Sequence, residues 1–261
     1  MKFTKMQGLG NDYLYIYGEV PLNAKELAVK YSDRHFGVGS DGLIFISPET
    51  KADFKMRIFN ADGSEAKMCG NGIRCVGKYL YDKGYTDKTE LKIETLSGIK
   101  TLNLSVVYGK VKAVTVDMGK TEVYKDITLT AADREFTVTP VSVGNPHIVV
   151  FTDDVDNFPV DIYGKILEKD KNFKGGVNVE FAEVKDGYIR MRVWERGSGI
   201  TLACGTGACA CLSAAVKKGL VKPDEVVTVK LDGGNLKIKY TDNAVIMSGG
   251  AEFIAEGETY D

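Results

Sequence analysis

The sequence predicts a mixed α/β fold of the α+β kind, with two pseudo-symmetric, β-barrel-like domains that arise from an internal duplication and each wrap around a central helix. Two observations predict it. Strand-like runs rich in Val, Ile, Tyr and Phe dominate the chain, and its second half repeats its first half at a nearly constant offset. With 261 residues, of which 44% are hydrophobic, the chain is long enough for two domains that each have a core.

The repeat is clearest around two cysteines. Adding 135 to the residue number carries Cys69 to Cys204 and Phe59 to Trp194. The stretch "FKMRIFNADGSEAKMCGNGIRC" then aligns without a gap on "IRMRVWERGSGITLACGTGACA", and the shorter motif "GND" (10–12) matches "GNP" (144–146) at an offset of 134. We therefore expect one domain from residues 1–116 plus 250–261, which carries Cys69, and a second from residues 117–249, which carries Cys204.

Each half is expected to contain the same elements in the same order. The strands expected in the first half are 13–17, 42–46, 55–59, 91–96 and 101–108, and those in the second half are 146–151, 177–184, 188–194, 226–231 and 236–240. An outer helix is expected over 24–34 and over 160–170. A central helix follows each Cys-Gly-x-Gly and ends at Gly84 or Gly219, where a helix C′ residue is commonly glycine. The second of these, "GACACLSAAV", is small or apolar all round, which is typical of a helix buried on every side.

Composition excludes several classes of protein. The net charge of −2 gives no general attraction to nucleic acid. Apolar runs such as "LIFI" (43–46) are too short to span a membrane, and "MKFTKMQGLGND" has no hydrophobic signal region. Five cysteines in tight clusters and two histidines fit neither a disulfide framework nor the usual spacing of a zinc site. We expect a cytoplasmic protein with no nucleic-acid partner, no membrane contact and no metal.

The two repeated cysteines are the candidate functional residues. Cys69 and Cys204 each precede a helix start, where unpaired N–H groups and the helix dipole favour negative charge. This setting is expected to lower the thiol pKa, and the glycines that follow let a ligand anion such as a carboxylate approach the backbone. The other cysteines, Cys75, Cys209 and Cys211, are interpreted as small apolar side chains inside the helices.

The duplication also suggests a reaction. Two halves related by an approximate two-fold axis place equivalent groups on opposite sides of one cleft. One thiolate can then remove a proton from a stereocentre while the opposite thiol delivers a proton to the other face. Helix N-termini would stabilise the charge that develops on a carboxylate.

These residues also show a family resemblance. The chain resembles diaminopimelate epimerase over essentially its full length, in the motifs "KMQGLGNDY" (5–13), "FNADGSEAKMCGNGIRC" (59–75), "VGNPHIVVF" (143–151), "GVNVEF" (176–181) and "VWERGSGITLACGTGACA" (193–210). The resemblance implies cofactor-independent epimerisation of L,L-diaminopimelate to meso-diaminopimelate, in the formation of lysine and peptidoglycan precursors. It implies that Cys69 and Cys204 are the catalytic acid and base.

The resemblance further implies a set of substrate-binding residues, which are Asn11, Asn60, Gly70, Asn71, Asn145, Asn178, Glu195, Arg196, Gly205 and Thr206. Arg196 suits a carboxylate because its guanidinium is a planar fork, and Asn side chains both donate and accept. From the residues alone, Asn60 in "NADG" is equally well a turn residue, and Glu195-Arg196 a surface ion pair. The resemblance makes His147 and Glu195 candidates for tuning the thiol pKa values, although a lone histidine is usually structural.

Two positions depart from the family resemblance. Gly42 stands where some relatives have Gln, and Ile200 stands where many have Glu.

Alternatives to this function remain open. A racemase of the proline racemase type shares the architecture, but its first motif reads Cys-Gly-His-Gly rather than "CGNG". A silent amino-acid-binding protein is disfavoured by both cysteines, and a metal-binding structural protein by their spacing. Deuterium uptake from heavy water into diaminopimelate or proline separates these readings. A homodimer is held as a hypothesis because edges of β-rich domains can pair.

Overall fold

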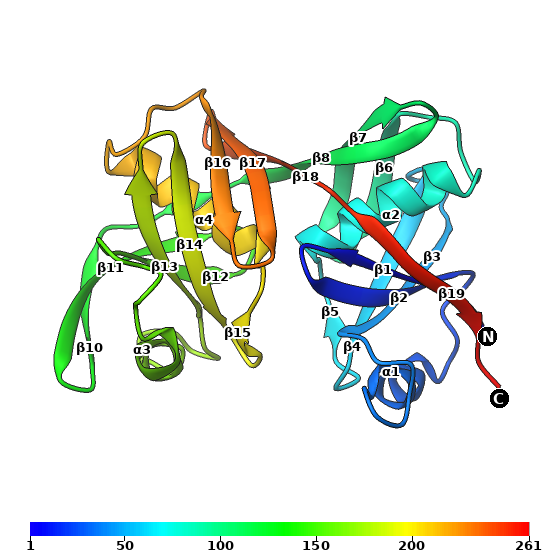
Figure 1. Ribbon diagram of the computed structural model, residues 1–261, viewed down its shortest axis with the longest axis horizontal. Coiled ribbons are helices and arrows are strands. Elements are labelled where there is room, and N and C mark those ends of the chain that lie inside the picture. Colours follow the sequence, from blue (N-terminus) through cyan, green and yellow to red (C-terminus); the bar gives the residue numbers. More distant parts are fainter. Residues whose placement is uncertain (261) are drawn as a thin grey trace. The chain divides into compact units, whose positions relative to one another are not determined.

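The computed structural model describes residues 1–260 and divides the chain into two compact units. The first contains Met1–Val116 together with the segment that begins at Gly249, and the second contains Asp117–Ser248. Each unit is a sheet with two helices, so the mixed α/β fold predicted from the sequence is confirmed (Figure 1).

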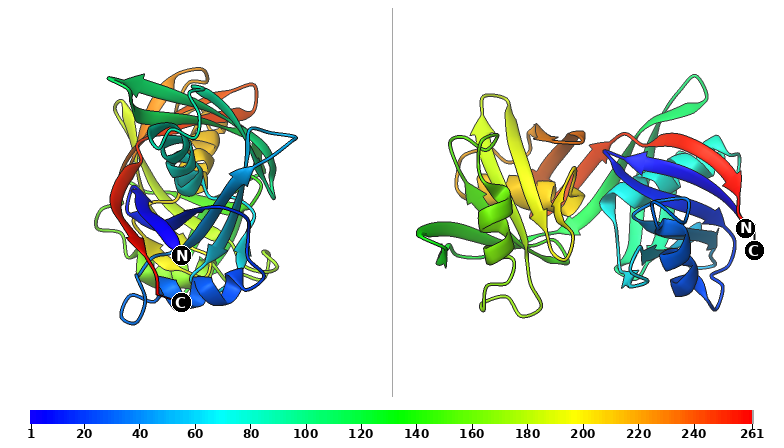
Figure 2. Two further views of the ribbon diagram at one scale, coloured as in Figure 1. Left: turned by 90° about the vertical axis from the view of Figure 1, so that its right-hand side faces the viewer. Right: turned by 60° about the horizontal axis from the view of Figure 1, so that its bottom comes forward.

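The first unit contains most of the N-terminal strands and ends with the last strand of the chain. Its elements are β1 (Lys2–Gly8), β2 (Asn11–Tyr17), α1 (Ala24–Ser32), β3 (Gly42–Pro48), β4 (Phe54–Asn60), β5 (Glu65–Ala66), α2 (Gly70–Asp82), β6 (Glu90–Thr95), β7 (Gly98–Val107), most of β8 (Lys110–Lys120) and β19 (Glu252–Glu258). Strand β19 pairs antiparallel with β1, so both ends of the chain belong to this unit (Figure 2).

The second unit repeats this plan. Its elements are β9 (Glu122–Val123), β10 (Ile127–Ala131), β11 (Arg134–Ser142), β12 (Pro146–Phe151), α3 (Val160–Leu167), β13 (Asn178–Lys185), β14 (Tyr188–Glu195), β15 (Gly199–Thr201), α4 (Gly205–Lys217), β16 (Val226–Leu231), β17 (Gly234–Thr241) and β18 (Ala244–Gly249).

Strand pairing follows the same pattern in both units. β2–β3 and β12–β13 are parallel, while β3–β4 and β13–β14 are antiparallel. The register also agrees, because Leu43 lies opposite Phe59 in the first unit and Val179 lies opposite Trp194 in the second. These are the pairs that the repeat relates, at offsets of 136 and 135, as an internal duplication requires.

Each unit surrounds one helix with its sheet (Figures 1 and 2). Helix α2 is buried from Gly70 to Leu80, and α4 is buried from Gly207 to Ala215. Their N-caps are Cys69 and Cys204. Glycine follows the last turn of each helix with positive φ, at 78° for Gly84 and 72° for Gly219, as predicted for C′ residues. The fold therefore fixes each cysteine at the N-terminus of a buried helix.

The strands expected from apolar runs are confirmed, with ends that differ by at most three residues. The outer helices are shorter than expected, because α1 ends at Ser32 and α3 at Leu167. No helix within residues 1–260 is both long enough and apolar enough to cross a membrane.

Helix α3 packs so closely on β14 that one glycine leaves no room for a methyl group. A Cβ at Gly164 would lie 2.5 Å from Trp194 Cβ and 2.8 Å from Cγ of its rigid indole ring. Gly164→Ala is expected to lower the free energy of unfolding by about 1–3 kcal/mol, because overpacking outweighs the better helix propensity of alanine. Urea unfolding of the wild-type protein and of Gly164→Ala measures this loss. Gly250→Ala, where a Cβ meets nothing within 4 Å, is the control and should be near neutral.

Candidate active site

Both central helices begin at a cysteine with the same local geometry. Cys69 has an extended backbone (φ −138°, ψ 117°), and its Sγ accepts a hydrogen bond from Gly72 N at 3.3 Å. Cys204 is likewise extended (φ −113°, ψ 109°), and its Sγ accepts from Gly207 N at 3.3 Å. Each sulfur therefore caps its helix at a position where the N–H groups and the dipole attract negative charge.

Cys69 is connected to a polar network in the first unit. Its thiol donates to Asn11 Oδ1 at 3.4 Å, and Asn11 Nδ2 donates to Asp41 Oδ2 at 2.7 Å. Asp41 is paired in turn with Arg34 at 2.9 Å. Because a carboxylate only accepts, Asp41 holds the Asn11 amide with its NH₂ turned away from the thiol and its oxygen turned toward it.

Two other residues proposed for substrate binding in this unit have side chains engaged elsewhere. Asn60 ends β4, accepts from Tyr13 at 3.4 Å and donates to Ser64 at 3.1 Å, which fits its reading as a turn residue. Asn71 is buried, and its Oδ1 accepts from Arg74 at 3.0 Å. Gly70 O also accepts from Arg74. Gly70 and Asn71 lie in the first turn of α2, where backbone N–H groups lack partners within the helix.

Cys204 lies among polar side chains of the second unit. The carboxylate of Glu195, which accepts a hydrogen bond from Thr201, lies near this thiol. Thr206 Oγ1 lies 3.5 Å from the sulfur and accepts from Asn145 Nδ2 at 3.4 Å. Glu195 is therefore directed inward to the thiol, and the reading of Glu195-Arg196 as a surface ion pair is not what the structure shows.

His147 lies behind this group. Its Nε2 is 3.1 Å from Asn145 Oδ1, and its Nδ1 is 2.7 Å from Glu180 Oε1. Both His147 and Glu180 are buried. The ring thus connects a buried carboxylate on β13 to an asparagine beside the helix start.

Asn178 connects two backbone segments of the same unit. Its Nδ2 donates to Pro146 O at 3.1 Å, and its Oδ1 accepts from Arg196 N at 3.0 Å. This fixes the backbone of Arg196, whose side chain is exposed and reaches Gly175 O at 3.5 Å. Arg196 is therefore an accessible guanidinium held on an ordered loop.

The expectation of a lowered thiol pKa is wrong for Cys204. Burial raises the pKa of the Cys204 thiol well above 9.0, and the nearby carboxylates of Glu195 and Glu180 raise it further. The hydrogen bonds from Thr206 and Gly207 lower it, but they do not outweigh burial. Burial likewise raises the pKa of Glu195 above its usual range. Cys204 is thus a thiol in the free protein, next to a carboxyl group that holds protons more readily than usual.

The buried cysteines behave as the sequence suggested. Cys75, Cys209 and Cys211 are fully buried inside the helices. Burial raises the pKa of Cys75 to about 11 and that of Cys211 well above its usual value. Cys75 and Cys211 are therefore protonated at neutral pH, and burial shields all three thiols from reagents.

The raised pKa of Cys204 gives a direct test. Glu195→Gln is expected to lower that pKa, because it removes the nearest negative charge, and so to speed alkylation of Cys204 by iodoacetamide at pH 8. The rate, followed by peptide mass spectrometry, should rise with pH in the wild-type protein because the thiolate forms only above pH 9. Cys75 serves as the internal control and should stay unmodified. Slower alkylation of Cys204 in the variant would contradict this electrostatic account.

Sequence reasoning missed the residues behind the site. Arg34, Asp41 and Glu180 were not singled out, although they hold Asn11 and His147. The available signal for Glu180 was a charged residue inside the apolar strand run "VNVEFA". Asp41 and Arg34 are in a polar loop that gives no such signal.

Gly42 and Ile200, the two positions that depart from the family resemblance, have different surroundings. A Cβ at Gly42 would lie 2.2 Å from Phe59 O, so no side chain fits there without a backbone shift. Ile200 is 45% exposed on β15. Neither residue belongs to the N-terminal turn of α2 or α4.

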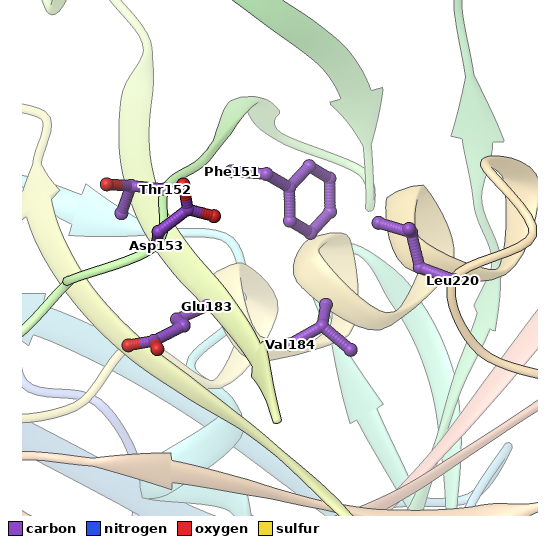
Figure 3. A pocket seen from close by; sticks show the side chains of 6 residues that line it. All are labelled: Phe151, Thr152, Asp153, Glu183, Val184 and Leu220. Carbon is purple, nitrogen blue, oxygen red and sulfur yellow. The ribbon is translucent and has the colours of Figure 1, made fainter. Parts of the chain in front are cut away.

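A depression on the second unit lies apart from the predicted residues. It has a volume of about 310 Å³ and is lined by Phe151, Thr152, Asp153, Glu183, Val184 and Leu220 (Figure 3). Its only ionisable side chains are the acidic pair Asp153 and Glu183, and it contains none of the predicted site residues. The candidate site is therefore assigned from the chemistry at the helix N-termini and not from this depression.

A duplicated fold with a thiol at the start of each central helix defines the class of epimerases and racemases. Solved structures share the fold over nearly the whole chain. A probable proline racemase from Agrobacterium radiobacter K84 gives a TM-score of 0.79 at 16% identity and covers 99% of this chain and 92% of its own. A hydroxyproline epimerase from Agrobacterium vitis gives 0.76 at 17% identity, covering 98% and 91%.

The sequence places the chain within this class. A model of the family described as diaminopimelate epimerase matches residues 3–124 and 139–254. Diaminopimelate epimerases from Acetivibrio thermocellus and Methanococcus maripaludis strain C5 are each 50% identical over 99% of this chain and cover 98% and 99% of their own length. The enzyme of that name from Bacillus subtilis strain 168 is 46% identical over 98% of this chain and 97% of its own. The chain belongs to the diaminopimelate epimerase family and is an isomerase.

Proposed function

We propose that this protein interconverts L,L- and meso-diaminopimelate by a two-base reaction at Cys69 and Cys204, without a cofactor. The observation that supports it most is the matched pair of thiols, each at the N-terminus of a central helix. The substrate has a reacting α-carbon and a distal ammonium–carboxylate centre that must be bound but not inverted. The reaction requires that the two thiols reach opposite faces of the reacting carbon.

The partners of the two thiols support different resting roles. The Cys204 thiol lies near the carboxylate of Glu195, which can accept its proton, whereas the Cys69 thiol donates to the Asn11 amide oxygen, which cannot. In the L,L-to-meso direction Cys204 is therefore the proton acceptor and Cys69 the donor. In the reverse direction these roles are exchanged.

The protons balance as follows. Glu195 takes the Cys204 proton as the substrate ammonium group arrives, and the Cys204 thiolate then removes the α-proton. Cys69 delivers its proton to the opposite face and becomes the thiolate. Solvent carries the proton from Glu195 back to Cys69 before the next turnover. Only acid–base groups take part, which suits a reaction that changes configuration and nothing else.

The remaining residues bind the substrate. The first-turn N–H groups at Gly70-Asn71 and Gly205-Thr206 stabilise charge on the carboxylate of the reacting centre. Asn11 and Asn145 hydrogen-bond the same centre. Arg196, on the loop fixed by Asn178, takes the distal carboxylate through its planar fork, and Asn60 completes that end.

The setting of the reaction follows from its chemistry. It supplies meso-diaminopimelate to lysine and peptidoglycan precursor formation. Two reduced thiols are needed, which the cytoplasm maintains, so we place the enzyme there. A homodimer stays a proposal, as does the absence of a nucleic-acid partner.

Deuterium incorporation tests the function. The purified chain is incubated in heavy water with L,L-diaminopimelate, proline or 4-hydroxyproline, with no added cofactor and after dialysis against a chelator. We expect deuterium at one α-carbon of diaminopimelate together with inversion of that centre. Exchange into proline in preference to diaminopimelate would assign the proline racemase activity instead, and no exchange into any of them would refute the proposal.

A further inference from the structure

Glu180 is a buried carboxylate that the reaction above does not use. Its side chain and that of His147 are 0% exposed, and its Oε1 lies 2.7 Å from His147 Nδ1. Its Oε2 is buried and has no hydrogen-bond partner among residues 1–260. Such a carboxylate is costly in the fully charged state unless a proton or a cation neutralises it. The hydrogen-bond partner of Glu180 that can do so is His147.

The second ring nitrogen of His147 shows where the hydrogens lie. Nε2 is 3.1 Å from Asn145 Oδ1, which only accepts, so Nε2 carries a hydrogen. The remaining proton lies between Glu180 Oε1 and His147 Nδ1. Whether it is bonded to the oxygen or to the nitrogen, Nε2 keeps its hydrogen and the pair has no net charge.

The pair is packed against the start of α4. A Cβ at Gly207 would lie 2.5 Å from Glu180 Oε1, so the carboxylate lies directly against the helix turn whose N–H bonds Cys204 Sγ. The ionisable groups that interact with the pair or its neighbours are Glu195 on β14 and Cys204 and Cys211 on α4. All of these become negative when they ionise, so the surroundings disfavour a pair that carries a net negative charge.

We propose that Glu180 is a positioning residue, which through His147 holds the Asn145 amide with its oxygen toward the ring and its NH₂ toward Thr206 at the start of α4. The inference rests on the proposed function, in which that NH₂ binds the carboxylate of the reacting centre. Without a hydrogen on Nε2, Asn145 would turn its NH₂ to the ring and present its oxygen to an anionic ligand.

The equivalent asparagine in the first unit has the opposite orientation. Asn11 corresponds to Asn145 at an offset of 134, but Asp41 accepts from its NH₂ and leaves its oxygen for the Cys69 thiol. The residue behind each asparagine therefore decides which end of the amide faces the helix start. Asp41 selects the oxygen in one unit, and the Glu180–His147 pair selects the NH₂ in the other.

A double-mutant cycle tests this chain of contacts. Glu180→Leu, which leaves no group beside His147 Nδ1 to fix the ring hydrogens, is expected to lower kcat/KM for diaminopimelate by about 10- to 100-fold, as for a misplaced binding group. In an Asn145→Ala background the same substitution should have no further effect. The matched control is Glu183→Leu on the same strand, which removes a carboxylate that pairs with Lys185 and should stay within about twofold of wild type. A wild-type rate for Glu180→Leu, or the same loss in both backgrounds, would overturn the inference.

The protonation of the His147 ring can be measured in the wild-type protein, so the proposal can be tested even if the variant does not fold. The chain has two histidines, so ¹⁵N-histidine NMR gives two sets of ring signals, and His35→Gln assigns them. We expect a hydrogen on Nε2 of His147 at neutral pH, and a bare Nε2 would refute the proposal. Because this readout needs no turnover, it stays valid if diaminopimelate is not the substrate.

Discussion

Replacing Cys69 or Cys204 with alanine is expected to abolish epimerisation of diaminopimelate, with a loss of at least about 10³-fold in kcat for either variant. A two-base reaction stops when one face of the carbon lacks its acid or base. The double variant should be no slower than the worse single variant, because the thiols act as one unit. A coupled assay of meso-diaminopimelate formation measures the loss, and circular dichroism checks that the variants are folded.

The same chain offers three matched controls. Cys75→Ala, Cys209→Ala and Cys211→Ala remove thiols that are fully buried inside the helices and should change kcat by less than about threefold, with a modest loss of stability. A single thiol that remains in Cys69→Ala or Cys204→Ala can still exchange the α-proton on its own side. Near-normal inversion in either catalytic variant would end the two-base mechanism.

Much of the fold could be predicted because the duplication made each half a check on the other. The offset of 135 residues placed both helix starts at once, and glycine at positions 84 and 219 marked both helix ends. Apolar runs marked the central strands. Strand β19 gave no such signal because its first five residues are exposed. Its partner β1 also lies at the other end of the chain.

The electrostatics of the site could not be predicted from the helix starts alone. A helix N-terminus lowers a thiol pKa, but Glu195 comes from β14 and Glu180 from β13, and both lie near Cys204 only after folding. Burial of the thiol adds to their effect. The sequence therefore indicated candidate reacting groups, while their resting protonation depended on residues brought together by the sheet.

Gly207→Ala is expected to be the most damaging substitution that removes no polar group. The added methyl would lie 2.5 Å from Glu180 Oε1, and that oxygen cannot retreat because it is bonded to His147 in a fully buried pair. Separating the pair should cost about 3 kcal/mol of stability. It should also lower kcat/KM by about 100-fold, since Asn145 and the Gly207 N–H bond to Cys204 both shift.

The repeat supplies the control for this prediction at the equivalent position. Gly72 occupies the same place in α2, but a Cβ there would meet Ile44 Cδ1 at 2.8 Å, which is the end of a side chain that can rotate. Gly72→Ala should therefore cost only about 1 kcal/mol and less than tenfold in kcat/KM. Urea unfolding and steady-state kinetics on both variants decide the matter. Equal losses at the two positions would show that close helix packing, rather than the buried Glu180–His147 pair, makes glycine necessary after each cysteine.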